Sequence, residues 1–262
     1  MADMAVGGVN RPVWVDLSSA DPAASHAFYS RVFGWDVVVS PDPRYAGYAM
    51  ARIGEQDVAG IGPTMAPDAP TAWMAYVGTP DAEALVRQVQ AAGGRVVAPP
   101  FDVGDAGRMT VFQDPSGAFI SAWQPKSMGG FHAGVPNTFG WAELNARGIE
   151  RAIPFYREVF GWTPQTRDTG PGMPPYTEFQ LGGRSIAGGT EMNPMVPGEV
   201  PSHWLVYFAV ADVERSFRTA IEAGAHEMLA PRDYPGGRLA ILRDPQGAVF
   251  GLISMSGPAA AE

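Results

Sequence analysis

The chain repeats its own motifs at a nearly constant separation. Trp14-Val15-Asp16-Leu17 returns 127 residues later as Trp141-Ala142-Glu143-Leu144. Asp114-Pro115-Ser116-Gly117-Ala118 returns 130 residues later as Asp244-Pro245-Gln246-Gly247-Ala248. Because the separation drifts so little, short loop insertions account for the difference. The chain is therefore predicted to hold two copies of one domain, and equivalent positions in the copies are the first candidates for functional sites.

Length and composition are typical of a folded protein with two domains. A chain of 262 residues can form two domains, each with its own core. With 46% hydrophobic and 17% charged residues, it is globular rather than disordered. We expect a first domain over residues 1–125, a linker rich in Gly and Pro over 126–137, a second domain over 138–257 and a tail over 258–262.

The acidic balance and the lack of cysteine exclude several classes of function. A net charge of -9 repels phosphate backbones and anionic lipid, so neither nucleic acid nor a membrane surface is an expected partner. Without cysteine the chain has no disulfide, thiolate metal site or cysteine nucleophile. Residues 1–10 lack the features of a signal peptide, and no stretch is apolar for long enough to span a bilayer. We expect a cytoplasmic monomer or homodimer whose partner is a small molecule.

The order of predicted elements also repeats within each copy. Residues 13–18 alternate like a strand, and Asp21-Pro22 predicts the start of a helix that Gly34 ends. Three further strands follow, and the same order begins again at Trp73. The fold class is therefore predicted to be α+β, with four βαβββ modules in two pseudo-symmetric domains.

One residue conflicts with this pattern. Pro154 falls inside the predicted helix 149–160, where a missing N–H predicts a bend or a late start. The matching residue of the first copy is Ala27, so the fold itself does not require proline there.

The combined motifs resemble those of a known superfamily. Phe33-Gly34-Trp35, its counterpart Phe160-Gly161-Trp162 and the two Asp-Pro-x-Gly motifs resemble the vicinal oxygen chelate superfamily of glyoxalase I, bleomycin-resistance proteins and extradiol dioxygenases. More narrowly, they are similar to actinobacterial glyoxalase-like proteins, a group that includes a mycobacterial antigen of about this size. The resemblance implies two cup-shaped sheets. Metalloenzymes of that superfamily place His, Gln or Glu on the first and last strands of the modules.

The positions that carry metal ligands in that superfamily lack donors here. Counting from the motifs places the first-strand positions on Trp14 and Trp141, and the last-strand positions on Ser121 and Gly251. The remaining positions fall on or near Met74, Leu205, Gly60 and Gly188. A divalent ion needs several N or O side-chain donors, which this set does not offer. We therefore expect no cofactor and no metal, which argues against glyoxalase I and dioxygenase chemistry.

Asp16 and Glu143 are the first catalytic candidates. Each follows a former ligand position by two residues, so strand geometry turns it toward the cup. Burial in an apolar cup raises the pKa of a carboxyl, which suits a general base near neutral pH. The alternative is structural: each carboxylate accepts hydrogen bonds from backbone or arginine at a module interface.

His203 is the third catalytic candidate. It precedes Leu205 by two residues and should share its face, and its match in the first copy is Ala72. A histidine at the start of a strand, half in solvent, is the favoured alternative. A residual metal site built from Asp16, Glu143 and His203 stays open as a further alternative.

Aromatic residues on the cup strands predict a wall for a flat organic ligand, although core packing is the alternative. Variable loops over residues 41–47 and 166–175 are candidate lids. Two arginines that precede matching strands could pair with Asp16 and Glu143, fix an anionic ligand, or serve the structure. The complete predicted ligand-binding set is Trp14, Trp141, Tyr48, Tyr176, Phe179, Trp123, Ser121, Met74, Leu205, Arg108 and Arg238.

Three functions are consistent with these residues. The first is a metal-independent enzyme that converts a small, largely apolar metabolite, aromatic or polyketide-like, with Asp16 or Glu143 as acid or base. The second is a protein that only sequesters such a molecule, as bleomycin-resistance proteins do. The third is a divergent metal-dependent glyoxalase or dioxygenase. The duplicated carboxylates favour the first function over the second, and the absent ligands argue against the third.

Overall fold

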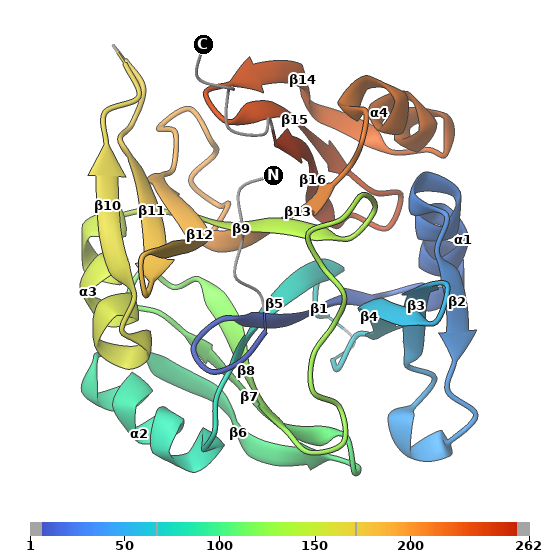
Figure 1. The fold of residues 1–262 in the computed structure, drawn as a ribbon, viewed down its shortest axis with the longest axis horizontal. Coiled ribbons are helices and arrows are strands. Elements are labelled where there is room, and N and C mark those ends of the chain that lie inside the picture. The colour runs from blue at the N-terminus through green and yellow to red at the C-terminus, as the bar shows by residue number, and fades with distance from the viewer. Residues whose placement is uncertain (1–6, 67, 171, 256–262) are drawn as a thin grey trace.

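A computed structural model describes residues 7–66, 68–170 and 172–255, and it contains two eight-stranded sheets with two helices each (Figure 1). The first half of the chain forms β1 (Pro12–Ser19), α1 (Pro22–Phe33), β2 (Asp36–Val39), the 3₁₀ helix η1 (Pro43–Tyr45), β3 (Ala49–Ile53), β4 (Gln56–Pro63), β5 (Ala72–Gly78), α2 (Ala82–Ala91), β6 (Arg95–Val103), β7 (Gly107–Gln113) and β8 (Phe119–Pro125). The second half forms β9 (Phe139–Ala146), α3 (Ile149–Phe160), β10 (Thr163–Arg167), β11 (Tyr176–Leu181), β12 (Arg184–Glu191), β13 (His203–Ala209), α4 (Val213–Glu222), β14 (His226–Tyr234), β15 (Gly237–Arg243) and β16 (Val249–Met255). The predicted tail 258–262 lies outside the described residues.

The two sheets have the same strand order. The first runs β2-β3-β4-β1-β5-β8-β7-β6, and the second runs β10-β11-β12-β9-β13-β16-β15-β14. In the first sheet β1 pairs with β4 in parallel and with β5 in an antiparallel manner, and β9 does the same with β12 and β13. Each sheet therefore joins two βαβββ modules at their first strands, which confirms the predicted α+β class.

Local sequence signals account for α1. The side chain of Asp21 accepts a hydrogen bond from the Ala24 backbone N–H at 3.0 Å, and Pro22 occupies the first helical position. Gly34 ends the helix in a left-handed conformation with φ of 71°, and its N–H donates to the Ser30 carbonyl. Such a φ strains residues that carry a Cβ, so glycine is favoured there.

Pro154 lies inside α3, which is continuous over Ile149–Phe160. Its missing N–H leaves the carbonyl of Glu150 without its usual helical partner, and Glu150 is exposed to solvent, where water can hydrate that carbonyl. The helix therefore accommodates the proline on its solvent side.

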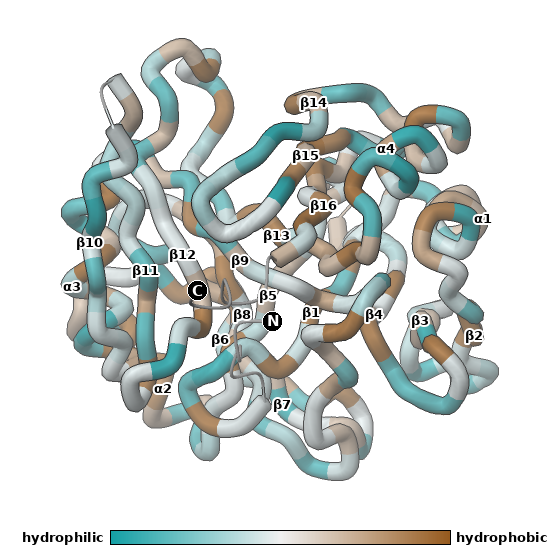
Figure 2. The backbone as a smooth tube through the Cα atoms, turned by 45° about the horizontal axis from the view of Figure 1, so that its top comes forward, coloured by the Kyte–Doolittle hydropathy of each residue, from teal (hydrophilic) through white to brown (hydrophobic). Residues whose placement is uncertain are grey.

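The two sheets turn their helix-bearing faces toward each other. Helix α1 packs beside α4 and α2 beside α3, while β5 and β13 lie against each other at the centre (Figure 1). One continuous apolar cluster includes buried residues of both halves, so the expectation of a separate core in each copy is wrong. Phe33 of α1, for example, packs on Phe208 of β13 with ring centroids 4.9 Å apart. Hydrophobic stretches mark β13 and β16 in Figure 2, whereas α4 is mostly hydrophilic on its outer side.

The repeated motifs hold the two halves together. The indole of Trp73 donates to the hydroxyl of Tyr29 at 2.8 Å, and that hydroxyl donates to the Asp244 carboxylate of the other half at 2.8 Å. The counterpart runs from Trp204 through Tyr156 to Asp114. The Phe-Tyr and Asp-Pro-x-Gly motifs are thus buried links between the copies.

Within the part of the chain that the structure describes, no helix combines the length and the apolar character that crossing a bilayer requires.

Candidate functional site

The outer face of the first sheet holds a cavity of about 430 Å³, between that sheet and the turns at its edge. This volume is in the range of small-molecule sites. Aromatic and methionine side chains form much of the lining, among them Trp14, Tyr48, Tyr76, Trp123, Met50, Met109 and Met128. Flat rings and polarisable thioethers of this kind favour a flat apolar ligand.

Asp16 is a carboxyl that lines this cavity, and two tyrosines hold it. Its Oδ2 accepts hydrogen bonds from the hydroxyls of Tyr76 at 2.9 Å and Tyr48 at 3.3 Å. The Tyr48 hydroxyl in turn accepts from the indole N–H of Trp14 at 2.9 Å. Burial raises the pKa of Asp16 to about 6, although both tyrosine hydrogen bonds oppose that shift. Asp16 therefore combines a fixed orientation with a pKa near neutrality.

Strand geometry explains how these groups meet. Trp14 and Asp16 share the outer face of β1, while Val15 and Leu17 point into the core. Gly60 lies opposite Asp16 on β4, and a Cβ there would come within 1.7 Å of the Tyr48 hydroxyl. A glycine at a position related to metal binding in the superfamily thus makes room for an aromatic ring.

One predicted lid, residues 41–47, lies at the mouth of this cavity. It contains η1, and Arg44, Tyr45 and Ala46 line the cavity. The Tyr45 ring lies over Gly104 in the turn between β6 and β7, where a Cβ would be 2.6 Å from the Tyr45 hydroxyl. The Arg44 guanidinium is held by Asp42 at 2.7 Å. The second predicted lid, residues 166–175, includes residue 171, which lies outside the described residues.

The second sheet repeats the cluster around Glu143. The indole of Trp141 donates to the Tyr176 hydroxyl at 2.9 Å, and the Tyr207 hydroxyl donates to Glu143 Oε1 at 3.4 Å. The amide of Asn145 donates to the same oxygen at 3.2 Å. Burial raises the pKa of Glu143, and the neighbouring polar groups oppose the shift. The two carboxyls thus lie on the outer faces of different sheets, each with its own aromatic partners.

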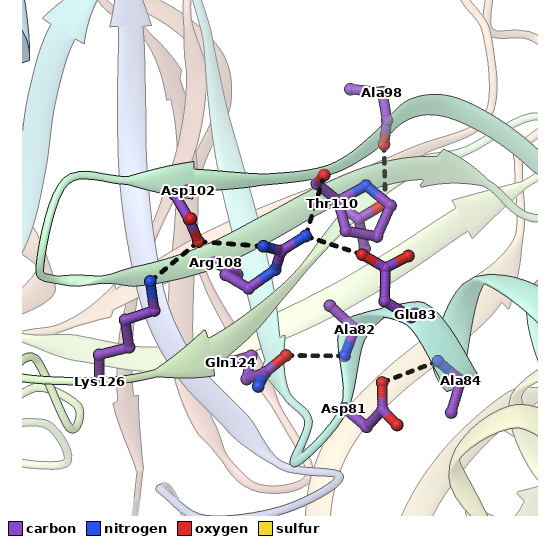
Figure 3. Close-up of polar contacts among 11 residues, drawn as sticks. Asp81, Ala82, Glu83, Ala84, Ala98, Asp102, Arg108, Thr110, Gln124 and Lys126 are labelled. Atoms are coloured by element: carbon purple, nitrogen blue, oxygen red, sulfur yellow. Dashed lines mark hydrogen bonds and ion pairs between the residues drawn. The ribbon is translucent and has the colours of Figure 1, made fainter.

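Both predicted arginines lie on the helix side of their sheets. Arg108 pairs with Glu83 of α2 at 2.7 Å and with Asp102 at 3.2 Å (Figure 3). Arg238 pairs in the same way with Glu214 and Asp233. Their neighbours Met109 and Leu239 pack on the outer faces, and alternation turns the arginines away from those faces. The predicted pairing with Asp16 and Glu143 is therefore wrong.

Phe179 also lies on the opposite face from the one predicted. It is three residues beyond Tyr176, an odd spacing that turns it into the core, where it packs on Tyr156 and Trp162. The predicted role in a ligand wall is wrong for this residue. Met74 packs on the aromatic cluster of the first outer face and Leu205 belongs to that of the second. Ser121 is buried, and its hydroxyl has no hydrogen-bond partner in the described structure.

His203 lies at the start of β13, opposite Asn145 of β9, and its Nδ1 is 2.9 Å from the Pro201 carbonyl oxygen. A metal site shared by Asp16, Glu143 and His203 is wrong, because the described residues contain no group of three or more potential His, Cys, Asp or Glu ligands. The histidine is partly exposed, as its strand-start position suggests.

Sequence reasoning missed Tyr76 and Tyr207, which donate hydrogen bonds to Asp16 and Glu143 respectively. Each follows a predicted position, Met74 or Leu205, by two residues and therefore shares its face. The period-2 signal that singled out Asp16 could have found them.

Comparison with known proteins supports this architecture. The model of the Glyoxalase/Bleomycin resistance protein/Dioxygenase superfamily matches residues 11–121 and 138–252, and the chain belongs to this superfamily. Anthracycline biosynthesis protein DnrV of Streptomyces peucetius is 38% identical over 259 residues, which cover 93% of each chain. A protein of Mycobacterium bovis named "Putative glyoxylase CFP32" is 38% identical over 249 residues, covering 92% of this chain and 94% of its own.

Solved structures share the fold at low identity. The 2,3-dioxygenase LapB from Pseudomonas sp. KL28 superposes with a TM-score of 0.69 at 17% identity, over 98% of this chain and 96% of its own. A Mn(II)-bound glyoxalase from Novosphingobium aromaticivorans gives 0.65 at 17% identity, over 95% and 83%. At this identity the likeness is one of fold, so the chemistry has to come from the residues of the site.

Proposed function

We propose that this protein binds a small, largely apolar metabolite, aromatic or polyketide-like, in the cavity of the first sheet and converts it by acid–base chemistry. The observation that carries the proposal is Asp16, a carboxyl with a pKa of about 6 in an aromatic cavity of about 430 Å³. A relative named for anthracycline biosynthesis supports a substrate of this class.

The geometry assigns separate tasks to the two carboxylate oxygens. Tyr48 and Tyr76 both donate to Oδ2, and among the side-chain hydrogen bonds of the described residues Oδ1 receives none. Asp16 is mostly ionised at pH 7, so Oδ1 can take a proton from a C–H or O–H group of the ligand. The two hydroxyls stabilise the carboxylate before transfer, and burial among aromatic side chains raises its pKa.

The proposed chemistry uses no metal. The first-strand position that holds a metal ligand elsewhere in the superfamily carries Trp14, which lines this cavity, and the last-strand position carries Ser121, which is buried opposite Tyr76. Neither residue suits a divalent ion. The partners of Asp16 are hydroxyls that act as donors to it.

Exchange of ligand protons with solvent tests the proposal directly. In D₂O the protein should catalyse deuterium incorporation into an anthracycline aglycone, detected by mass spectrometry. Asp16→Asn should lower this exchange by at least about 100-fold, a typical contribution of a general base, while affinity changes little. Glu143→Gln is the matched control in the second sheet and should leave exchange unchanged. Tight binding with neither exchange nor product would instead identify a sequestering protein.

A further inference from the structure

The outer face of the second sheet carries a more polar version of the first site. The Trp–Tyr pair, the carboxyl and the tyrosine of the central strand recur at matching register positions. Several cavity residues of the first sheet are replaced, however. Tyr234 corresponds to Val103 of the first copy, because each residue ends its strand opposite the first glycine of the next strand. Glu178 corresponds to Met50 of the first copy, because both lie opposite equivalent glycines in the register.

Aromatic rings surround Glu143 from several strands. Tyr207 donates to it and Tyr176 lies beside it. Burial, together with the nearby charge of Glu143, raises the pKa of Tyr234 to about 12. Tyr234 and Trp141 pack on the same apolar cluster as Tyr207. The partners of Glu143 are thus neutral hydroxyls and an amide, and further aromatic side chains pack on the same outer face.

Glycines in the sheet make this arrangement possible. A Cβ at Gly188 would come within 1.9 Å of the Tyr176 hydroxyl and 2.8 Å of the Trp141 indole nitrogen. A Cβ at Gly251 would come within 2.0 Å of the Tyr207 ring. The rings therefore occupy the space that a side chain at either glycine would fill, which lets them approach the carboxyl.

Solvent reaches part of this cluster. Glu143, Tyr176 and Tyr234 are partly exposed, as Asp16 and Tyr48 are in the first sheet, and Tyr207 is buried like Tyr76. Trp141 is partly exposed, whereas its counterpart Trp14 keeps only 3% of its exposure. A ligand can therefore contact these side chains without unfolding the sheet.

We propose that the second sheet holds a distinct site for an organic cation, such as a protonated or quaternary amine. A carboxylate offers the counter-charge, and the electron-rich rings of the partly exposed Trp141, Tyr176 and Tyr234 attract a cation through their quadrupoles. Glu178, which accepts from Ser185 and pairs with Arg167 at 3.5 Å, adds a further carboxylate to this face where the first sheet has methionine. The site is independent of the acid–base chemistry proposed for Asp16.

Choline and its uncharged carbon analogue 3,3-dimethylbutan-1-ol distinguish charge from shape. In ligand-observed NMR titrations, choline should bind at least about tenfold more tightly than the neutral analogue, the size of a desolvated cation–π contribution. Glu143→Gln should weaken choline binding roughly tenfold, and Tyr234→Val, which installs the residue of the first copy, should weaken it several-fold. Asp16→Asn is the matched control and should leave choline binding unchanged.

Three results would overturn the cation site. These are equal affinity for choline and the neutral analogue, no saturable choline binding to the unaltered protein, and equal losses from Asp16→Asn and Glu143→Gln. Circular dichroism of each variant separates loss of binding from loss of fold. Deuterium exchange into an anthracycline aglycone reports the first sheet alone, so failure of one proposal leaves the other measurable.

Discussion

The raised pKa that suits Asp16 to acid–base chemistry lowers the stability of the folded chain near neutral pH. Its carboxyl has a pKa of about 6 in the folded chain against 3.8 for the free group, so folding favours its protonated form. A raised carboxyl pKa contributes stability that is fully present below about pH 4 and is lost as pH rises through 6. A shift of this size corresponds to about 3 kcal/mol at pH 7.

The substitution Asp16→Asn should therefore affect the unfolding free energy more favourably at pH 7 than at pH 4. We expect the difference in unfolding free energy between variant and parent to rise by up to about 3 kcal/mol over that interval, measured by urea denaturation. A flat difference for Asp16→Asn would mean that its carboxyl titrates normally.

At the residue scale, the sequence predicted the correct face of the sheet for some side chains and the wrong face for others. Trp14, Asp16 and Tyr48 line the cavity, as predicted. Counting from the repeated motifs placed Trp14 on the outer face, and strand alternation placed Asp16, two residues later, on the same face. Phe179 and Arg108 required the register of strands whose exact start the sequence does not show. An error of one residue in that start moves a side chain to the other face.

Single elements were predictable where local signals agree. Helix α1 starts after Asp21 and ends at Gly34 because both signals are local. Strand β6, in contrast, runs on through Pro99 and Pro100, which argue against a strand. It lies at the edge of its sheet and its register shifts around these residues, so the prolines break few ladder bonds.

The two copies provide a matched test of proline in a helix. Pro154→Ala restores an N–H in α3 and should raise the unfolding free energy by about 1 kcal/mol, less than the usual proline penalty because the structure has adapted. Ala27→Pro at the equivalent site in α1 should lower it by about 3 kcal/mol. Thermal denaturation of both variants measures the two changes in unfolding free energy. Equal and opposite changes would show that α3 has not adapted to its proline.

At the scale of the whole molecule, the repeat predicted two sheets but not the way in which they share a core. Contacts such as Phe33 on Phe208 join residues that are far apart in sequence, and no local pattern encodes them. The repeated Tyr29 and Asp244 motifs signalled the fold family without revealing that each motif binds the opposite copy. Repeated motifs that contact the other copy give the same sequence pattern as repeated motifs that contact their own copy.

A shared core and crossed hydrogen bonds predict that the two halves unfold together. Denaturation followed by tryptophan fluorescence and by far-UV circular dichroism should give coincident transitions. Tyr29→Phe leaves the Asp244 carboxylate and the Trp73 indole without their buried partner, which should cost about 1–3 kcal/mol. Tyr156→Phe in the other half should lower the midpoint of the same single transition by a similar amount, whereas Tyr45→Phe at the cavity mouth should change it little. If each variant instead shifted one of two separable transitions, the halves would be independent folding units, and the crossed links would serve only to orient them.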